Sequence, residues 1–264
     1  MRFIFFLILL VSSPSYCNET IIVDDFSSYK DTSDFLDTWE SRVDGYKKTL
    51  KQNSYYYYLR PDPYEKGKNC LCSSLRMFPK GFVRKDIEPK DIKMTMDGGP
   101  IKAVSIYKDY WLKKIKIGKF HKEGKRVFLE WEWLANKLPV GALETKNNDD
   151  HAMAVYVALH LGWTNFRTIK YVWSSTSDLG PIPANVTKDK KKMVSIVSNS
   201  KTPLGKWIKV KVDLSKDIKK FLPNRYNDLS IAAVAVLSNS DNLKKPSEAC
   251  VRNIKLVVLE EGQK

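Results

Sequence analysis

The sequence predicts an all-β protein, built as a sandwich or barrel with long early loops and at most one short helix. From residue 101 onward, short runs rich in β-branched and aromatic residues alternate with turn residues at regular spacing, which is typical of these architectures. Helical periodicity is confined to residues 215–221. Because strands and helices do not alternate along the chain, the sequence argues against a nucleotide-binding α/β fold.

The predicted strands are short apolar segments bounded by turn signals. The first lies at residues 21–23. Residues 44–100 contain dense turn signals and the tyrosine run 55–58, which is interpreted as part of a strand or, alternatively, as an aromatic platform for a sugar. The clearer strands after residue 101 are predicted at 104–107, 112–117, 127–133, 152–159, 168–173, 193–197, 207–212, 231–237 and 251–259.

The amino terminus has the order of parts of a secretory signal peptide. Arg2 supplies positive charge, residues 3–11 form an unbroken apolar run, and residues 12–17 end it. The run is too short to cross a bilayer core, which requires about 20 helical residues. We expect cleavage after Cys17 and export of the mature chain to the periplasm or the exterior. A lipoprotein is disfavoured because bulky Tyr16 precedes the cysteine.

The mature chain is predicted to be one sandwich with a decorated amino-terminal part. Residues 1–17 are the signal peptide, residues 18–100 a strand- and loop-rich part of the sandwich, and residues 101–264 its main body. Hydrophobic residues make up 43% of the sequence, which is enough for a substantial core. No later apolar run reaches about 18 residues, so no membrane span is expected in the mature chain.

The chain is strongly basic, with a formal net charge of +15. Most of this charge is lysine interleaved with apolar residues, as in 206–212, a pattern that indicates strands with one solvated face. No recognition helix, zinc-finger spacing or RNA-binding aromatic signature accompanies the charge, so nucleic acid is not an expected partner. A glycan or an anionic envelope polymer remains a candidate ligand.

Three cysteines remain after removal of the leader, namely Cys70, Cys72 and Cys250. In an oxidising compartment we expect one structural disulfide, joining Cys250 to Cys70 or to Cys72. A bridge between Cys70 and Cys72 themselves would close a very small, strained ring. A metal site is disfavoured because the sequence shows no second pair of ligands.

The densest polar group of residues is formed by two segments at predicted strand ends. Asp149, Asp150 and His151 precede one strand, and Asp241 and Asn242 follow another. If those strands are neighbours, the carboxylates of Asp149, Asp150 and Asp241 could bind Ca²⁺, which prefers hard oxygen ligands. The alternative is that these side chains simply cap turns. A carboxylate pair for glycoside hydrolysis would need Asp241, because Asp149 and Asp150 are adjacent and point to opposite faces of a strand.

Seven tryptophans offer a second route to ligand binding, because an exposed ring can stack on the apolar face of a sugar. Trp131, Trp133 and Trp207 are expected in the core. Trp163 and Trp173 lie near predicted loops and are the candidate ligand-binding rings.

A series of motifs in the second half of the chain resembles a bacterial family of exported proteins, the domain-of-unknown-function family three thousand and forty-seven. The resemblance covers residues 101–259 and, more weakly, 23–39. It implies an antiparallel jelly-roll β-sandwich similar to galactose-binding and carbohydrate-binding modules, without an established activity. Where members of the family commonly carry Arg before a Val-Tyr-Val element, this chain has Ala154, which argues against a basic ligand contact there. The motifs are Trp131-Glu132-Trp133, Leu138-Pro139, Asp149-Asp150-His151-Ala152, Val155-Tyr156-Val157, Tyr171-Val172-Trp173, Gly205-Lys206-Trp207 and Asp241-Asn242.

These patterns favour an exported, non-catalytic binding module of the cell envelope, for carbohydrate or another envelope polymer. A carbohydrate-active enzyme, a hydrolase or lyase with a carboxylate pair, is the first alternative. A structural envelope protein is the second.

Overall fold

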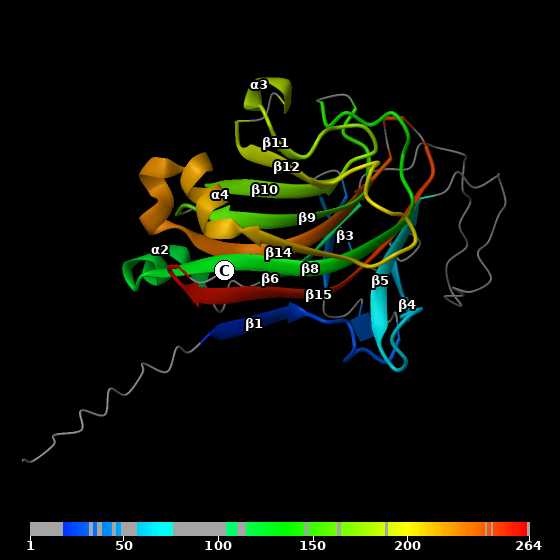
Figure 1. The fold of residues 1–264 in the computed structure, drawn as a ribbon, viewed down its shortest axis with the longest axis horizontal. Helices are drawn as coiled ribbons and strands as arrows, with labels where there is room; N and C mark the ends of the chain where they lie inside the picture. Colours follow the sequence, from blue (N-terminus) through cyan, green and yellow to red (C-terminus); the bar gives the residue numbers. More distant parts are fainter. Residues whose placement is uncertain are drawn as a thin grey trace, which may run out of the picture.

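The computed structural model shows a β-sandwich of the jelly-roll type, in agreement with the predicted fold class (Figure 1). Several predictions fall on residues outside the described ranges, among them the leader 1–17, Trp163 and Asp241. The structure describes residues 18–31, 34–35, 39–43, 46–48, 57–75, 104–109, 115–145, 148–162, 165–187, 190–240, 242–243 and 245–262.

The smaller sheet has six strands in the order β13-β8-β15-β5-β4, with β1 also paired to β15, and every pair is antiparallel. The long strand β15 is central because it contacts β8 along its length and then β5 and β1 in succession on its other edge. The bounds are β1 Glu19–Asp24, β4 Tyr57–Pro61, β5 Asn69–Leu75, β8 Lys125–Lys137, β13 Ile208–Asp213 and β15 Ser247–Glu260.

The larger sheet has nine strands in the order β11-β12-β10-β9-β14-β6-β2-β3, with β7 also paired to β14. All pairs are antiparallel except β10 with β12, which run parallel. Strands from residues 18–100 therefore enter both sheets. The bounds are β2 Glu40–Val43, β3 Tyr46–Lys48, β6 Val104–Asp109, β7 Ile115–Lys116, β9 His151–His160, β10 Phe166–Trp173, β11 Gly180–Ile182, β12 Lys192–Ser198 and β14 Ser230–Asn239.

Short helices connect the strands, and the prediction of at most one was wrong. The predicted helix is α4, Leu214–Phe221, whose first turn is capped by the Asp213 carboxylate accepting from Lys216 N at 2.9 Å. Residues 112–117 were predicted as a strand, but Ile117 begins α2. This helix is too short to show helical periodicity. Its Gly118 lies so close to the Asn227 backbone that no side chain would fit. The other helices are α2 Ile117–Lys122, α3 Ala184–Thr187 and the 3₁₀ helix η3 Pro223–Asp228.

The core between the sheets is built from alternating side chains, as the strand pattern predicts. In β8 the rings of Trp131 and Trp133 face inward and are almost fully buried. They meet aromatic rings of β10 in the opposite sheet, with centroids 5.7 Å apart for Trp131 and Tyr171 and 5.4 Å apart for Trp133 and Trp173. Such pairs add about 0.5–1.5 kcal/mol each beyond area burial. Glu130 and Glu132, which alternate with these tryptophans along β8, consequently face outward.

The amino-terminal motif around Asp24 is a buried cluster of hydrogen-bonded side chains. The Asp24 carboxylate accepts from Phe26 N at 2.7 Å, from Trp39 Nε1 at 2.8 Å and from the Tyr29 hydroxyl. The rings of Phe26, Phe35 and Trp39 pack on one another and complete this end of the core. Asp24, Tyr29 and Trp39 therefore have a structural role at this end of the core.

Candidate functional site

The two polar segments singled out in the sequence lie together at one end of the larger sheet. β9 and β14 are antiparallel neighbours, with His151 opposite Asn239. Asn242 Nδ2 consequently reaches both carboxylates, donating to Asp149 Oδ1 at 3.1 Å and to Asp150 Oδ1 at 3.2 Å. Asp241, the third predicted ligand, lies outside the described residues.

Asp150 has the geometry of a turn cap. Its side chain is fully buried, and its two carboxylate oxygens accept from the backbone N–H groups of Asn242 at 3.2 Å and Leu243 at 2.7 Å. These bonds close the turn that follows β14 and satisfy the buried carboxylate. Calcium binding by Asp149, Asp150 and Asp241 stays a prediction. Asp150 is a poor member of a hydrolytic pair, because both of its oxygens are engaged by the backbone.

A buried ionic centre that the sequence analysis missed lies beside these residues. Lys170 of β10 points to the outer face of the larger sheet, where its Nζ is 2.9 Å from Glu144 Oε2 and 3.7 Å from Asp149 Oδ2. His151 Nδ1 is 3.6 Å from Glu144 Oε1 and donates to the Asp149 carbonyl at 2.7 Å. A lysine within the otherwise apolar run 169–173 was the available signal, because a buried ammonium requires a partner.

Burial governs the protonation of this centre. It raises the pKa of Glu144, which the nearby Lys170 ammonium only partly opposes. Burial, together with the Lys170 charge, lowers the pKa of His151 well below 6.5, so the imidazole is neutral at pH 7. Burial alone would lower the pKa of Lys170, but Glu144, Tyr156 and Asp149 outweigh it and raise the pKa. The ion pair between Lys170 and Glu144 links the loop before β9 to β10.

The predicted ligand-binding tryptophans do not form an exposed platform in the described structure. Trp173 is fully buried, with Nε1 donating to the Asn199 carbonyl at 3.2 Å, so its ring cannot stack on a ligand and that expectation was wrong. The cause is that Trp173 faces the core between the sheets, where its ring packs against that of Trp133. Trp163 lies outside the described residues. Trp207, expected in the core, is half-buried on the outer face of the smaller sheet, where Arg252 lies 4.4 Å above its ring.

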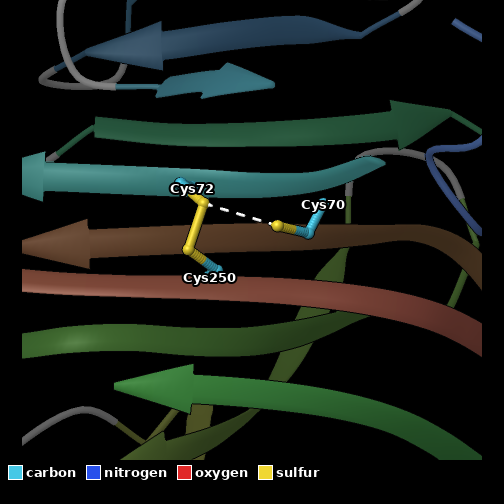
Figure 2. A group of neighbouring side chains, drawn as sticks. All are labelled: Cys70, Cys72 and Cys250. Atoms are coloured by element: carbon cyan, nitrogen blue, oxygen red, sulfur yellow. Dashed lines mark hydrogen bonds between the residues drawn. A yellow bond between two sulfur atoms is a disulfide. The ribbon is translucent and has the colours of Figure 1, made fainter. Parts of the chain in front are cut away.

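The cysteines form one disulfide, between Cys72 and Cys250, which are directly opposite each other in β5 and β15 (Figure 2). The sequence left the choice between Cys70 and Cys72 open, and the strand register decides it. Cys70 is a free, buried thiol whose Sγ lies 3.7 Å from Cys72 Sγ. Burial raises the pKa of Cys70 to about 11, so the thiol is protonated at neutral pH.

An open groove of about 500 Å³ lies on the outer face of the smaller sheet. It is lined by residues of four neighbouring strands of that sheet, β13, β8, β15 and β1, and by Asp25, which follows β1. Sequence analysis did not find it, because the residues come from four segments spread over most of the chain. The side chains that define its chemistry are Ile22, Asp25, Glu130, Glu132, Lys209, Lys211, Asn253 and Lys255.

Ion pairs link the charged side chains of the groove. Glu130 lies between Lys211 at 3.3 Å and Lys255 at 3.2 Å. Glu132 accepts from Arg252 Nε at 2.6 Å and lies 3.8 Å from Lys209 Nζ. Each carboxylate therefore contacts cations from both neighbouring strands.

Backbone irregularities in two strands coincide at the groove. The pairing of β15 with β8 shifts between Arg252 and Lys255, and Asn253 has a positive φ of 53° there. The pairing of β1 with β15 shifts between Ile22 and Asp24. Bulges of this kind re-aim side chains and are over-represented next to functional sites. Both shifts lie beside residues that line the groove.

Fold and groove together define a jelly-roll β-sandwich protein with an open polar groove on one sheet. The chain belongs to the family described as Protein of unknown function (DUF3047), whose model matches residues 115–255. Comparison with curated proteins found no significant match.

Solved structures of similar architecture include two modules and an enzyme. A family 30 carbohydrate-binding module of a cellulosomal cellulase of Clostridium thermocellum has a TM-score of 0.45 at 10% identity, over 92% of this chain and 99% of that one. A family 11 carbohydrate-binding module of the same organism has 0.39 at 10%, over 90% and 94%. A family 12 xyloglucanase of Bacillus licheniformis has 0.38 at 9%, over 92% and 99%. Similarity of this extent assigns neither a ligand nor an activity.

Proposed function

We propose that this protein is an exported, non-catalytic binding module of the cell envelope that binds a neutral glycan in the groove of the smaller sheet. The observation that carries the proposal is the composition of that groove. It is open, about 500 Å³ in volume, and lined by charged side chains of both signs. A shape of this kind suits a segment of a polymer.

Charge balance within the groove favours a neutral ligand. The lining contains three lysines, Lys209, Lys211 and Lys255, and three carboxylates, Asp25, Glu130 and Glu132. The chain as a whole carries a net charge of +15, so this balance is a local departure from its composition. A groove for an anionic polymer would be expected to gather an excess of cations.

Hydrogen-bonding capacity matches a polyhydroxylated ligand. Sugar hydroxyls both donate and accept, and the groove alternates carboxylate acceptors with ammonium donors. Glu130 and Glu132 are alternate residues of β8, so their Cα atoms are about 6.7 Å apart along the strand. At the rim, the exposed side chain of Ile22 offers an apolar contact for the face of a sugar ring.

A glycan hydrolase is the second candidate, and one observation favours it. Glu130 and Glu132 are alternate residues of β8, and their backbone spacing of about 6.7 Å is compatible with the separation of about 6.5–9.5 Å between the carboxyl groups of inverting enzymes. Glu130 and Glu132 are nevertheless each paired with two cations, which occupy the oxygens that a catalytic acid or base would present to a sugar. The pairing favours binding over catalysis.

Export rests on the signal-like sequence of residues 1–17 and is supported by the Cys72–Cys250 disulfide, which is typical of oxidising compartments. None of the described helices is long and apolar enough to span a bilayer.

A glycan array probed with the mature protein, starting at Asn18, tests the proposal. The groove variant Lys209→Ala/Lys211→Ala removes two donors whose side chains are 86% and 41% exposed, so the fold should be retained. Its matched control is Lys216→Ala/Lys219→Ala, the same change of charge on α4. We expect neutral glycans to bind the wild type and the control alike, and the groove variant at least tenfold more weakly.

Three outcomes would argue against this function. They are the absence of any neutral glycan ligand, an equal loss in both double variants, and release of reducing ends from a bound glycan, which would indicate the hydrolase. Running the array with and without a chelator also tests the predicted calcium site, because a calcium-dependent signal would implicate the Asp149 and Asp150 end of the larger sheet.

A further inference from the structure

A second compact group of side chains lies outside the groove. Cys70, Cys72 and Cys250, which we call the cysteine cluster, are fully buried, and their sulfur atoms all lie within 4.8 Å of one another (Figure 2). Among the described residues, no other group of three potential metal-ligating side chains is packed this closely.

Strand geometry creates the cluster. Cys70 and Cys72 are alternate residues of β5 and share one face, and Cys250 is paired directly with Cys72 across the sheet. Tyr58 belongs to the same buried cluster, and the half-buried Trp207 packs against it on the outer face of the smaller sheet. The cluster is therefore a single side-chain layer below the surface.

The arrangement does not suit internal disulfide exchange. An attacking thiolate must lie along the extension of the sulfur–sulfur bond, and at 3.7 Å from Cys72 it would then be about 5.8 Å from Cys250. Cys70 Sγ lies within 4.8 Å of Cys250 Sγ, which places it beside the bond.

Once the Cys72–Cys250 bond is reduced, the three sulfurs are close enough together to bind one metal ion as thiolates. With metal–sulfur bonds of about 2.3 Å, a trigonal ion separates its sulfurs by about 4.0 Å. The Cys70–Cys72 separation is already 3.7 Å. Soft thiolate sites select Cu(I) or Zn²⁺, but structural Zn²⁺ needs four ligands. Within the described part of the chain the cluster provides three, which favours Cu(I).

We propose that the reduced cysteine cluster binds one Cu(I) ion through all three sulfurs, and that the Cys72–Cys250 disulfide abolishes this site. Reduction by a dithiol breaks the sulfur–sulfur bond, transfers two electrons and two protons to the two sulfurs, and converts the dithiol to its disulfide. Cu(I) then displaces one proton from each of three thiols, and its oxidation state does not change.

Neighbouring cations offset the negative charge of such a centre. Three thiolates and one Cu(I) carry a net charge of −2. The Arg60 and Arg252 guanidinium groups both favour the Cys70 thiolate, whereas burial and the nearby Asp62 carboxylate oppose it, and the pKa of Cys70 is raised to about 11. The Arg60 carbonyl accepts from the Cys70 thiol at 3.7 Å, which orients Cys70 Sγ.

Competition for Cu(I) tests the proposal. The mature protein is reduced with dithiothreitol, desalted without oxygen and titrated with Cu(I) against a chromophoric chelator. Reduced wild type should take up one Cu(I) per chain, with three sulfur neighbours in the X-ray absorption spectrum. Cys70→Ser should bind at least tenfold more weakly, and the oxidised wild type should not compete.

Ser74→Ala is the matched control, because Ser74 is buried two residues beyond Cys72 on the same face of β5 and its loss removes no sulfur. This variant should bind Cu(I) as the wild type does. Should Cys70→Ser fail to fold, Cys70→Ala replaces it. Equal affinity of the wild type and the Cys70 variant, no uptake by the reduced wild type, or loss of the β circular dichroism signal in the Cu(I)-loaded protein would overturn the proposal.

Discussion

Removing the Cys72–Cys250 disulfide should cost the fold more than any single core contact. The bridge joins residues 178 positions apart, which encloses most of the mature chain. In the chain-entropy relation, closing a loop of this length removes about 17 cal/mol/K from the unfolded state, or about 5 kcal/mol at 25 °C. The double variant Cys72→Ala/Cys250→Ala is therefore expected to lose about 5 kcal/mol of unfolding free energy.

Urea denaturation followed by circular dichroism measures this loss. For an m value of about 3 kcal/mol/M, the midpoint should fall by about 1.7 M. Cys70→Ala is the control, because it removes a buried sulfur from the same cluster and leaves the cross-link, at a cost of about 1 kcal/mol. An equal shift in the control and the double variant, or no shift in either, would refute the reasoning that the cross-link stabilises the fold.

Three further predictions concern the buried residues of the larger sheet. The pKa of His151 is depressed in the folded state, so the contribution of the neutral imidazole to stability is present above pH 6.5 and is lost as the pH falls. Below pH 6.5 the wild type should lose about 1.4 kcal/mol of unfolding free energy per pH unit relative to His151→Gln. Urea midpoints measured across pH test this difference. Lys170→Met leaves Glu144 buried and unpaired and should cost about 3–5 kcal/mol, most of which the double variant with Glu144→Leu should recover in the same assay. Trp173→Ala should cost about 3–5 kcal/mol in thermal or urea unfolding, and a loss below about 1 kcal/mol would show that the ring is not in the core.

The strand pattern was sufficient to predict the sandwich, because alternation is a local property. Trp131 and Trp133 are spaced by two residues, so their shared inward face could be read from the sequence, and it is what the structure shows. Residue 117 was misassigned because a helix of one or two turns has no period to detect.

The candidate site depended on long-range pairing that no local pattern contains. Glu130 and Glu132 face outward by the same alternation, but the groove exists only because β13, β15 and β1 flank them. The bulge at Asn253 is likewise a product of the register between strands. Choosing Cys72 over Cys70 as the partner of Cys250 required that register too.

The central claim is that the groove of the smaller sheet, and not the polar end of the larger sheet, holds the ligand. Chemical-shift mapping of the isotope-labelled mature protein, titrated with a neutral oligosaccharide, tests it most directly. We predict saturable shifts confined to groove residues such as Glu130, Lys211 and Asn253 and unchanged by moderate salt, because a neutral ligand is not screened. Shifts centred on Asp149 and Asn242, or none at all with any neutral oligosaccharide, would contradict the account.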